Sequence, residues 1–344
     1  MIMNVDFLKE VLSLPSISGN ESVVRDYILE FAEKNQILST VDKKGNVYLT
    51  KGSDYMTEGE FYPCVVSHMD TVHRSHTEYV INKERLDIVE DDGILTARHP
   101  NSEIQTGIGG DDKCGVYVCL EMFNELNILK GAFFVEEEIG MLGSREADDR
   151  FFDNVGYAIQ FDAPSDNWIS EVCSGVKLFD EDFKEEITQT LNESGYTKFS
   201  IDPFTDVHQL ATKYDFNCLN LGCGYYRQHT DSEYVVIEEV SNSLKVGIKL
   251  IDKLGIKKYF HNKEVTKPLM TESTPYYGYN DMESDVDNYD IYGDDYDIYG
   301  DDEVLDEVSE SIVELVISMN EQGHNIEEIK YEVSKYLIDN SLYV

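Results

Sequence analysis

Five short polar stretches of the chain contain the residue types that bind divalent metal ions in proteins. In order they are Ser67-His68-Met69-Asp70-Thr71, Gly110-Asp111-Asp112-Lys113, Glu136-Glu137-Glu138-Ile139-Gly140, Phe161-Asp162 and Gln228-His229-Thr230. Two divalent ions held about 3.5–4 Å apart need one carboxylate that bridges them, with imidazole and carboxylate ligands at each end and room for a shared water. The five stretches together supply that set, and they predict a two-metal hydrolytic site.

His68 is the first candidate ligand. It follows the apolar run Tyr62-Pro63-Cys64-Val65-Val66, which is typical of a buried strand. At the end of such a strand its imidazole would reach a metal, and Asp70, two residues on, would orient the other ring nitrogen. A single histidine after a strand is more often structural than a ligand. We expect His68 to be a ligand because four further stretches accompany it.

Asp111 lies in the glycine-rich stretch 106–115, which leads into a helix with apolar periodicity. Glycines allow a backbone to approach a crowded centre. We expect Asp111 to be the carboxylate that bridges the two metals. A simpler role for Asp111 and Asp112, capping the helix that follows, is compatible with this one.

Three consecutive glutamates, Glu136, Glu137 and Glu138, follow the apolar segment 132–135. Their carboxylates would repel one another unless a positive charge lies among them, and a metal is the simplest source. We expect Glu138 to bind a metal, and Glu137 to act as general base toward the attacking water and then as acid toward the leaving amine. A solvated acidic strand end is the alternative interpretation.

The last two candidate ligands also follow predicted strands. Asp162 comes directly after the apolar run 157–161, and His229 ends the stretch 219–229, which we interpret as a strand followed by a polar turn. Four strand ends would then converge on one site, as they do where ligands bind at the carboxyl edge of an open α/β sheet.

These motifs resemble those of the co-catalytic zinc exopeptidases of the peptidase T and carboxypeptidase G type, namely His-x-Asp, Asp-x-Lys-x-Gly, Glu-Glu-x-Gly and a late His. The resemblance spans roughly Val5 to Leu250, and it includes Leu14-Pro15-Ser16-Ile17-Ser18-Gly19-Asn20-Glu21, which is similar to the amino-terminal helix–loop–helix of the family. It implies two zinc ions, one bound by His68, Asp111 and Asp162 and the other by Asp111, Glu138 and His229. It also implies that Asp70 and Glu137 are the catalytic pair.

The chain departs from this family between Asp162 and His229, where such enzymes usually insert a lid or dimerisation domain. The interval predicts only a strand-like 176–179, a helix over about 181–191 and a loop into 205–208. That leaves no room for a separate lid, as in the lidless aminopeptidases of the same clan. Four residues are therefore candidates for substrate contacts, with packing or surface roles as the alternative: Arg227, Tyr225, Tyr226 and His208.

The apolar periodicity predicts an α/β fold, an open and mostly parallel sheet covered by helices on both faces. We expect helices over about 5–12, 21–34 and 240–254, strands at 38–41 and 47–49 and near 65, 133, 159 and 219, and a hairpin within 79–97. Gly255 would end the last helix. The catalytic domain is expected to comprise residues 1–260.

Composition excludes several classes of partner. The formal net charge is −40, so the chain lacks the excess of basic residues typical of a nucleic-acid-binding protein. The same charge disfavours binding to an anionic membrane. The six cysteines have no compact spacing and lie mostly in apolar contexts, where reduced thiols pack as small hydrophobes. No signal segment opens the chain, and no run approaches the roughly 18 apolar residues of a membrane span. We therefore expect a cytoplasmic protein.

The carboxy-terminal part of the chain has a different composition. Residues 281–302 contain no Lys or Arg and repeat Tyr-Asp-Ile-Tyr-Gly-Asp-Asp at 289–295 and 296–302. We interpret 261–302 as an acidic, low-complexity linker. Apolar residues at helical spacing predict a helical hairpin over 303–344, which would dock on the catalytic domain, on a second copy in a homo-oligomer, or on a partner protein.

The leading hypothesis is a di-zinc aminopeptidase that hydrolyses short peptides. An N-acyl amino acid deacylase would use the same residues, and only a substrate screen would separate the two activities. A third hypothesis belongs to another class: a catalytically silent protein that keeps the fold and serves in binding or assembly. Loss of Glu137 or of a ligand would mark that case, and the sequence retains them all.

Overall fold

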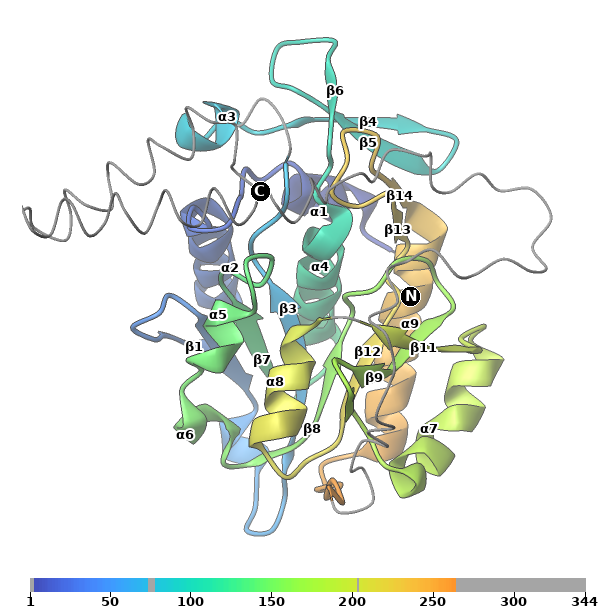
Figure 1. Cartoon of the computed structure of the whole chain (residues 1–344). Helices are drawn as coiled ribbons and strands as arrows, with labels where there is room; N and C mark the ends of the chain where they lie inside the picture. The colour runs from blue at the N-terminus through green and yellow to red at the C-terminus, as the bar shows by residue number, and fades with distance from the viewer. Residues whose placement is uncertain (1–2, 74–77, 203, 264–344) are drawn as a thin grey trace, which may run out of the picture. The chain divides into compact units, whose positions relative to one another are not determined.

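A nine-stranded sheet forms the centre of the protein (Figure 1). The structure, a computed structural model, describes residues 3–73, 78–202 and 204–263. The strand order is β1-β2-β7-β3-β8-β12-β9-β10, and β11 pairs with β9. The strands are β1 (Leu38–Val41), β2 (Val47–Lys51), β3 (Tyr62–His68), β7 (Leu129–Phe134), β8 (Val155–Gln160), β9 (Trp168–Cys173), β10 (Val176–Lys177), β11 (Lys198–Asp202) and β12 (Cys218–Leu221).

Four neighbouring strands run in the same direction. β3 pairs in parallel with β7 on one side and with β8 on the other, and β12 pairs in parallel with β8. Every residue of these four strands is buried, as expected for parallel strands that helices cover on both faces. Their carboxyl ends therefore meet at one edge of the sheet.

Helices cover both faces of this sheet (Figure 1). Behind it in the figure lie α2 (Ser22–Lys34), α4 (Gly110–Glu125) and α9 (Ile237–Leu254), with α1 (Val5–Leu12) packed on α4 and α7 (Glu181–Glu193) on α9. In front lie α5 (Leu142–Arg145) and α8 (Asp206–Lys213), and α6 (Asp149–Phe152) follows α5 along the chain. This arrangement confirms the predicted α/β fold.

A second, smaller sheet lies near the amino end of α4, toward the top of Figure 1. It has the order β13-β14-β5-β4, with β6 paired to β5. Its strands are β4 (Asp87–Asp91), β5 (Ile94–Arg98), β6 (Gln105–Thr106), β13 (Tyr225–Tyr226) and β14 (Tyr234–Val236). Because β14 pairs with β5, this sheet joins the segment before α4 to the segment after β12.

Several predicted elements differ from those observed. The hairpin turns at Asp92-Gly93 as expected, but its predicted start contains a short helix, α3 (Glu78–Ile81), and η1 (Ser53–Tyr55) is a further short helix. The expected loop over 205–208 is in fact the start of α8, an amphipathic helix with Asp206 in its first turn. The strand-like 176–179 is reduced to the two residues of β10.

The described fold continues just past the predicted boundary at 260. Phe260 forms a β-bridge with Phe216, and the Asn262 N–H donates to Asp180 Oδ2 at 3.0 Å. From residue 264 onward, the predicted acidic linker and the helical hairpin of 303–344 lie outside the described residues.

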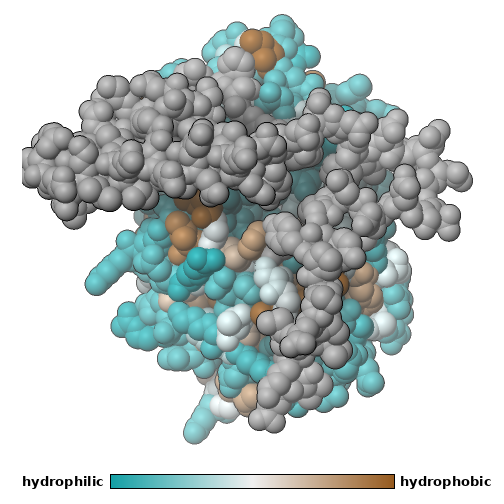
Figure 2. Space-filling model, in the orientation of Figure 1, coloured by the Kyte–Doolittle hydropathy of each residue, from teal (hydrophilic) through white to brown (hydrophobic). Residues whose placement is uncertain are grey.

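The visible surface is largely hydrophilic, with isolated hydrophobic residues (Figure 2). All six cysteines are buried free thiols. Among the described helices, none has the length and apolar character needed to cross a bilayer.

Candidate metal centre

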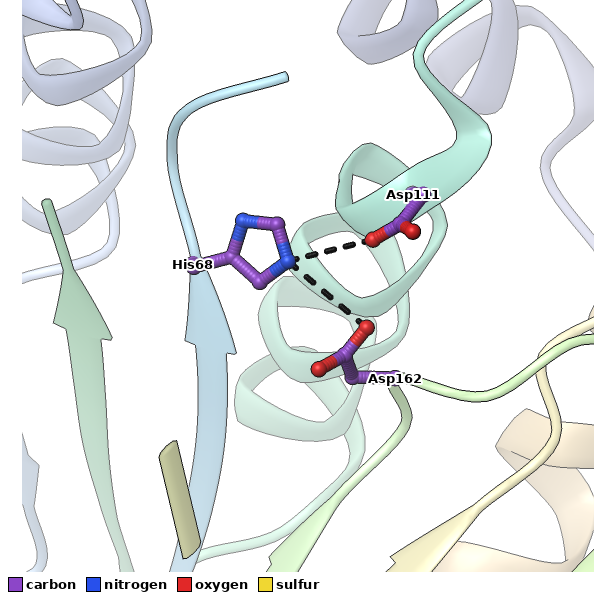
Figure 3. A group of neighbouring side chains, drawn as sticks. All are labelled: His68, Asp111 and Asp162. Atoms are coloured by element: carbon purple, nitrogen blue, oxygen red, sulfur yellow. Dashed lines mark hydrogen bonds and ion pairs between the residues drawn. The ribbon is translucent and has the colours of Figure 1, made fainter. Parts of the chain in front are cut away.

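The edge formed by β7, β3 and β8 brings four of the predicted site residues together. His68 is the last residue of β3, Asp162 lies two residues after β8, and Glu137 and Glu138 follow β7. Asp111 comes from the amino end of α4, and Figure 3 shows His68 pointing toward both Asp111 and Asp162. Adjacent parallel strands account for this convergence, because they end at the same edge.

The Asp111 carboxylate lies between two imidazoles. Its Oδ1 is 3.1 Å from His68 Nε2, and its Oδ2 is 3.3 Å from His229 Nε2. Burial alone would raise the pKa of Asp111, but the two imidazoles hold it below its ordinary value. One carboxylate oxygen therefore faces each side of the site, which is the arrangement that a bridging ligand needs.

Each side of Asp111 forms a three-residue group that suits a metal ion. His68, Asp111 and Asp162 make one group, in which His68 Nε2 is 3.6 Å from Asp162 Oδ1. Asp111, Glu138 and His229 make the other, in which His229 Nε2 is 3.0 Å from the Glu138 carboxylate. Within each group the ligand atoms lie within 4.8 Å of one another. The sequence motifs implied these two sets, and a third group of the described residues, His68, Glu137 and Glu138, also has its possible ligand atoms within 4.8 Å of one another.

His229 reaches the site by a route that the sequence did not indicate. It lies in the loop between β13 and β14, whereas we expected it in a polar turn following the strand that is β12. The small sheet therefore holds this ligand, with a positive backbone φ of 62°. Its side chain is 37% exposed, compared with 1% for His68, so the site is open on the His229 side.

Buried negative charge dominates the site. The side chains of Asp111, Glu137, Glu138 and Asp162 are at most 11% exposed. Burial, followed by the charge of Asp111, raises the pKa of Glu138 to about 7 and also raises that of Asp162. Burial raises the pKa of Glu137 well above its ordinary value. Four carboxylates with two imidazoles leave unbalanced negative charge, which divalent cations would neutralise.

Asp70 connects the ends of β3 and β7. Its carboxylate accepts the backbone N–H groups of Glu137, at 3.0 Å, and Glu138, at 3.1 Å, as well as the Ser18 hydroxyl at 2.8 Å. Its backbone carbonyl oxygen lies 3.0 Å from His68 Nδ1, closer than its carboxylate Oδ1 at 3.4 Å. Asp70 is therefore placed to orient the His68 ring, chiefly through its main chain.

The amino-terminal stretch 14–21 continues this support. Glu21 accepts the backbone N–H of Gly19 at 2.7 Å and that of Glu136 at 3.2 Å. With Asp70, it fixes three consecutive backbone N–H groups of the glutamate run. The conformation of the acidic segment is thus held by hydrogen bonds to its backbone.

Asp162 is oriented by polar residues that sequence reasoning missed. Gln160 Nε2 donates to Asp162 Oδ2 at 3.2 Å, and the Thr205 hydroxyl lies 3.4 Å from the same oxygen. Asn220 accepts the Asp162 N–H at 2.9 Å and donates to the Asp162 carbonyl oxygen at 2.7 Å. The available signal was a polar residue inside an apolar strand, since Gln160 ends β8 and Asn220 lies in β12.

The two residues after Asp111, Asp112 and Lys113, have structural roles. Asp112 Oδ1 accepts the Gly115 N–H at 3.1 Å, so Asp112 caps the regular part of α4 and leaves Asp111 free to face the imidazoles. The Lys113 ammonium is buried and donates to the carbonyl oxygens of Leu12, at 2.6 Å, and Leu14, at 3.1 Å. It anchors α4 to the end of α1.

The four candidate substrate contacts have different surroundings. The buried Tyr225 hydroxyl donates to Asp162 Oδ1 at 3.2 Å. Tyr226 instead donates to Glu239 at 2.7 Å and stacks on Tyr234 with ring centroids 5.1 Å apart. Arg227 is exposed, with its guanidinium 6.0 Å from the Tyr234 ring centroid. His208 is half-buried on α8, 3.3 Å from the Gln209 amide nitrogen.

Comparisons with known proteins establish the fold. No protein-family model matches the chain, and no curated protein matches it in sequence. Aminopeptidase PepT from Bacillus cereus has a similar structure, with 13% identity and a TM-score of 0.59 over 73% of this chain and 97% of its own. A Staphylococcus aureus tripeptidase has 14% identity and a TM-score of 0.56, over 72% and 96% of the two chains.

A third similar structure carries a different description. It comes from Thermotoga maritima, is described as an endoglucanase, and has 15% identity and a TM-score of 0.50 over 72% of this chain and 97% of its own. At such identities the likeness is one of fold. The reaction must therefore be argued from the site residues.

Proposed function

We propose that this protein is a di-zinc exopeptidase that removes amino-terminal residues from short peptides. The main observation in support is the Asp111 carboxylate, which faces His68 with one oxygen and His229 with the other. One zinc would be held by His68, Asp111 and Asp162, and the second by Asp111, Glu138 and His229. The likeness in fold to an aminopeptidase and a tripeptidase favours a peptide substrate.

The donor atoms suit zinc. Imidazole nitrogen and carboxylate oxygen are its usual ligands, whereas magnesium and calcium prefer all-oxygen sites. The excess of buried carboxylates requires cations for charge balance. Two ions that share Asp111 would meet both requirements.

Bound zinc would polarise the scissile carbonyl and acidify the attacking water. Glu137 lies outside the two groups that share Asp111, although it forms a third candidate group with His68 and Glu138, and its carboxylate is 4.0 Å from His68 Nε2. We assign it the role of general base: it takes a proton from the water as the oxygen bonds to the carbonyl carbon. It then gives that proton to the departing amine nitrogen as the carbon–nitrogen bond breaks.

The main alternative keeps the same site and changes the substrate. A deacylase would cleave the amide bond of an N-acyl amino acid with the same ligands and the same Glu137. The proposal does not include a lid. The described residues between Asp162 and His229 form strands of the two sheets and helices that pack on the large sheet. Substrate contacts would then come from the exposed side of the site, next to His229 and Arg227.

The test combines metal analysis with turnover of the full-length protein. We expect two zinc ions per chain, hydrolysis of amino-terminal amides and tripeptides in preference to N-acetyl amino acids, and loss of hydrolysis after treatment with a strong chelator. Full activity with less than one metal per chain would overturn the di-zinc proposal. Preferential cleavage of N-acetyl amino acids would favour the deacylase, and a metal-loaded but inactive protein would favour a binding role.

One substitution tests the general base. Glu137→Gln should reduce kcat about 10²–10⁴-fold with both metals retained, because an amide cannot accept the proton of the water. Glu136→Gln is the matched control, since the Glu136 side chain pairs with Lys44 and belongs to none of the three candidate groups. Its kcat should stay within a fewfold of wild type. Near-normal activity of Glu137→Gln, or loss of a metal, would show that the roles of Glu137 and Glu138 are misassigned.

A further inference from the structure

Glu233 is a buried acidic residue outside both predicted ligand groups. It is 1% exposed and lies four residues after His229, in the same loop between β13 and β14. Its Oε2 accepts the backbone N–H of Gly109 at 2.7 Å, and its Oε1 accepts that of Asp111 at 3.2 Å. One carboxylate therefore connects the loop that carries His229 to the backbone of Asp111.

The glycine-rich loop is packed tightly against this carboxylate. A Cβ atom on Gly110 would lie 3.3 Å from Glu233 Oε1 and 2.8 Å from side-chain atoms of Tyr225 and Val235. On Gly107 it would lie 3.1 Å from the Thr230 carbonyl oxygen and 3.3 Å from Glu233 Oε2. The loop thus lies directly against the β13–β14 hairpin, and the glycines permit that approach.

The contact joins two ligands that come from separate parts of the fold. Asp111 belongs to α4, whereas His229 belongs to the small sheet. A carboxylate that accepts two backbone N–H groups forms charge-assisted hydrogen bonds, which are stronger than neutral ones. Asp162, by contrast, is held mainly by Gln160 and Asn220 of the large sheet, and only its contact with Tyr225 comes from the β13–β14 hairpin.

We propose that Glu233 is a positioning residue that fixes His229 relative to Asp111, and thereby sets the metal affinity of the position bound by Asp111, Glu138 and His229. The inference rests on the two-metal site of the proposed function but not on the reaction. In Glu233→Gln the amide retains one acceptor and turns an N–H donor toward the other backbone N–H, so the loop that carries His229 can shift. Asp111 stays on α4, which Lys113 anchors to the end of α1, and the position that includes His229 should therefore weaken selectively. Residues that orient metal ligands typically contribute about 10–100-fold in metal affinity.

The experiment is a titration of the metal-free, full-length protein with cobalt(II), followed by absorption spectroscopy, and with zinc, followed by calorimetry. Wild type should show two binding steps. In Glu233→Gln one step should weaken about 10–100-fold while the other stays within threefold, and saturating zinc should restore two ions per chain. Glu238→Gln is the matched control, since Glu238 is an exposed residue in the first turn of α9, and both of its steps should match wild type.

Two results of the titration would contradict the proposed role of Glu233. Two unchanged steps in Glu233→Gln, or equal weakening of both, would overturn the inference. If Glu233→Gln does not fold, Glu233→Asp keeps the charge but shortens the reach, and the same criterion of selective weakening applies to it. A wild-type protein that binds two ions but cleaves no peptide would overturn the proposed function and leave this inference testable by titration.

Discussion

The Asp70 carboxylate accepts the backbone N–H groups of both Glu137 and Glu138, so a residue from the end of β3 fixes the two glutamates that follow β7. Burial would raise the pKa of Asp70, but His68, the Ser18 hydroxyl and the Glu137 N–H hold it below its ordinary value. An ionised Asp70 is therefore part of the scaffold on which the proposed base and ligand are placed.

Asp70→Asn should lower kcat and weaken metal binding together. The amide keeps one acceptor for two backbone N–H groups, so either Glu137 or Glu138 loses its hydrogen bond and faces an N–H donor instead. We expect a loss of about 10–100-fold in metal affinity, which is typical when a partner of a metal ligand is removed. Ser18→Ala, which removes only the hydroxyl donor to the same carboxylate, should have a smaller effect. Equal effects from the two substitutions, measured by metal content and kcat, would contradict this role.

The bridging assignment of Asp111 predicts an asymmetry among alanine variants. Asp111→Ala should disturb both metal positions, because its two oxygens face opposite sides of the site. Asp162→Ala and Glu138→Ala should each weaken mainly one position. The measurement is metal content per chain after gel filtration at a fixed free zinc concentration. A uniform loss from all three variants would argue against a bridge.

The adjacent residues Tyr225 and Tyr226 should differ in their effect on metal affinity. Tyr225→Phe removes a buried hydrogen bond to Asp162, and hydrogen bonds to charged groups contribute about 1.5–3 kcal/mol. We expect weaker binding at the position held by His68, Asp111 and Asp162. Tyr226→Phe removes only the donor to Glu239 and should leave both metal affinities within twofold. Unchanged metal binding in Tyr225→Phe would contradict the role assigned to Tyr225, and weaker metal binding in Tyr226→Phe would contradict that of Tyr226.

A chain ending at Lys263 should fold, bind both metals and hydrolyse a small substrate within a fewfold of the full-length rate, since all five motif stretches lie before that point. A chain ending at Gly255 should be less stable. It lacks Tyr259, whose ring centroid lies 5.2 Å from that of Phe183 and 5.7 Å from that of Tyr157. Thermal unfolding and metal content of the two truncations test the prediction. A metal-free or insoluble chain ending at Lys263 would place later residues in the core.

The sequence predicted the parts of the site that follow from strand polarity. His68 and Asp162 each come at the end of an apolar run, and parallel strands bring such residues to one edge whatever the intervening loops do. The helices with a clear apolar face were also predictable: the expected helix over 5–12 is α1, and Gly255 ends α9.

What the sequence did not predict depends on contacts between distant segments. The small sheet forms because β14 pairs with β5, and nothing local to either three- to five-residue strand specifies that partner. The sequence did not predict β11, because this strand is partly exposed where it pairs with β9 and its residues show little apolar pattern. The supporting roles of Gln160 and Glu233 likewise appear only once the strand ends are assembled.

The pairing of β14 with β5 also determines when the proposed metal centre could be completed during synthesis. His229 reaches its place only after residues 234–236 have joined a hairpin made much earlier in the chain. A growing polypeptide that has released His68, Asp111, Glu138 and Asp162 from the ribosome still has an incomplete second position. Under the proposed assignment, binding of two ions would therefore require a chain made at least as far as β14, and a fragment that ends before it would hold only the ligands of the first position.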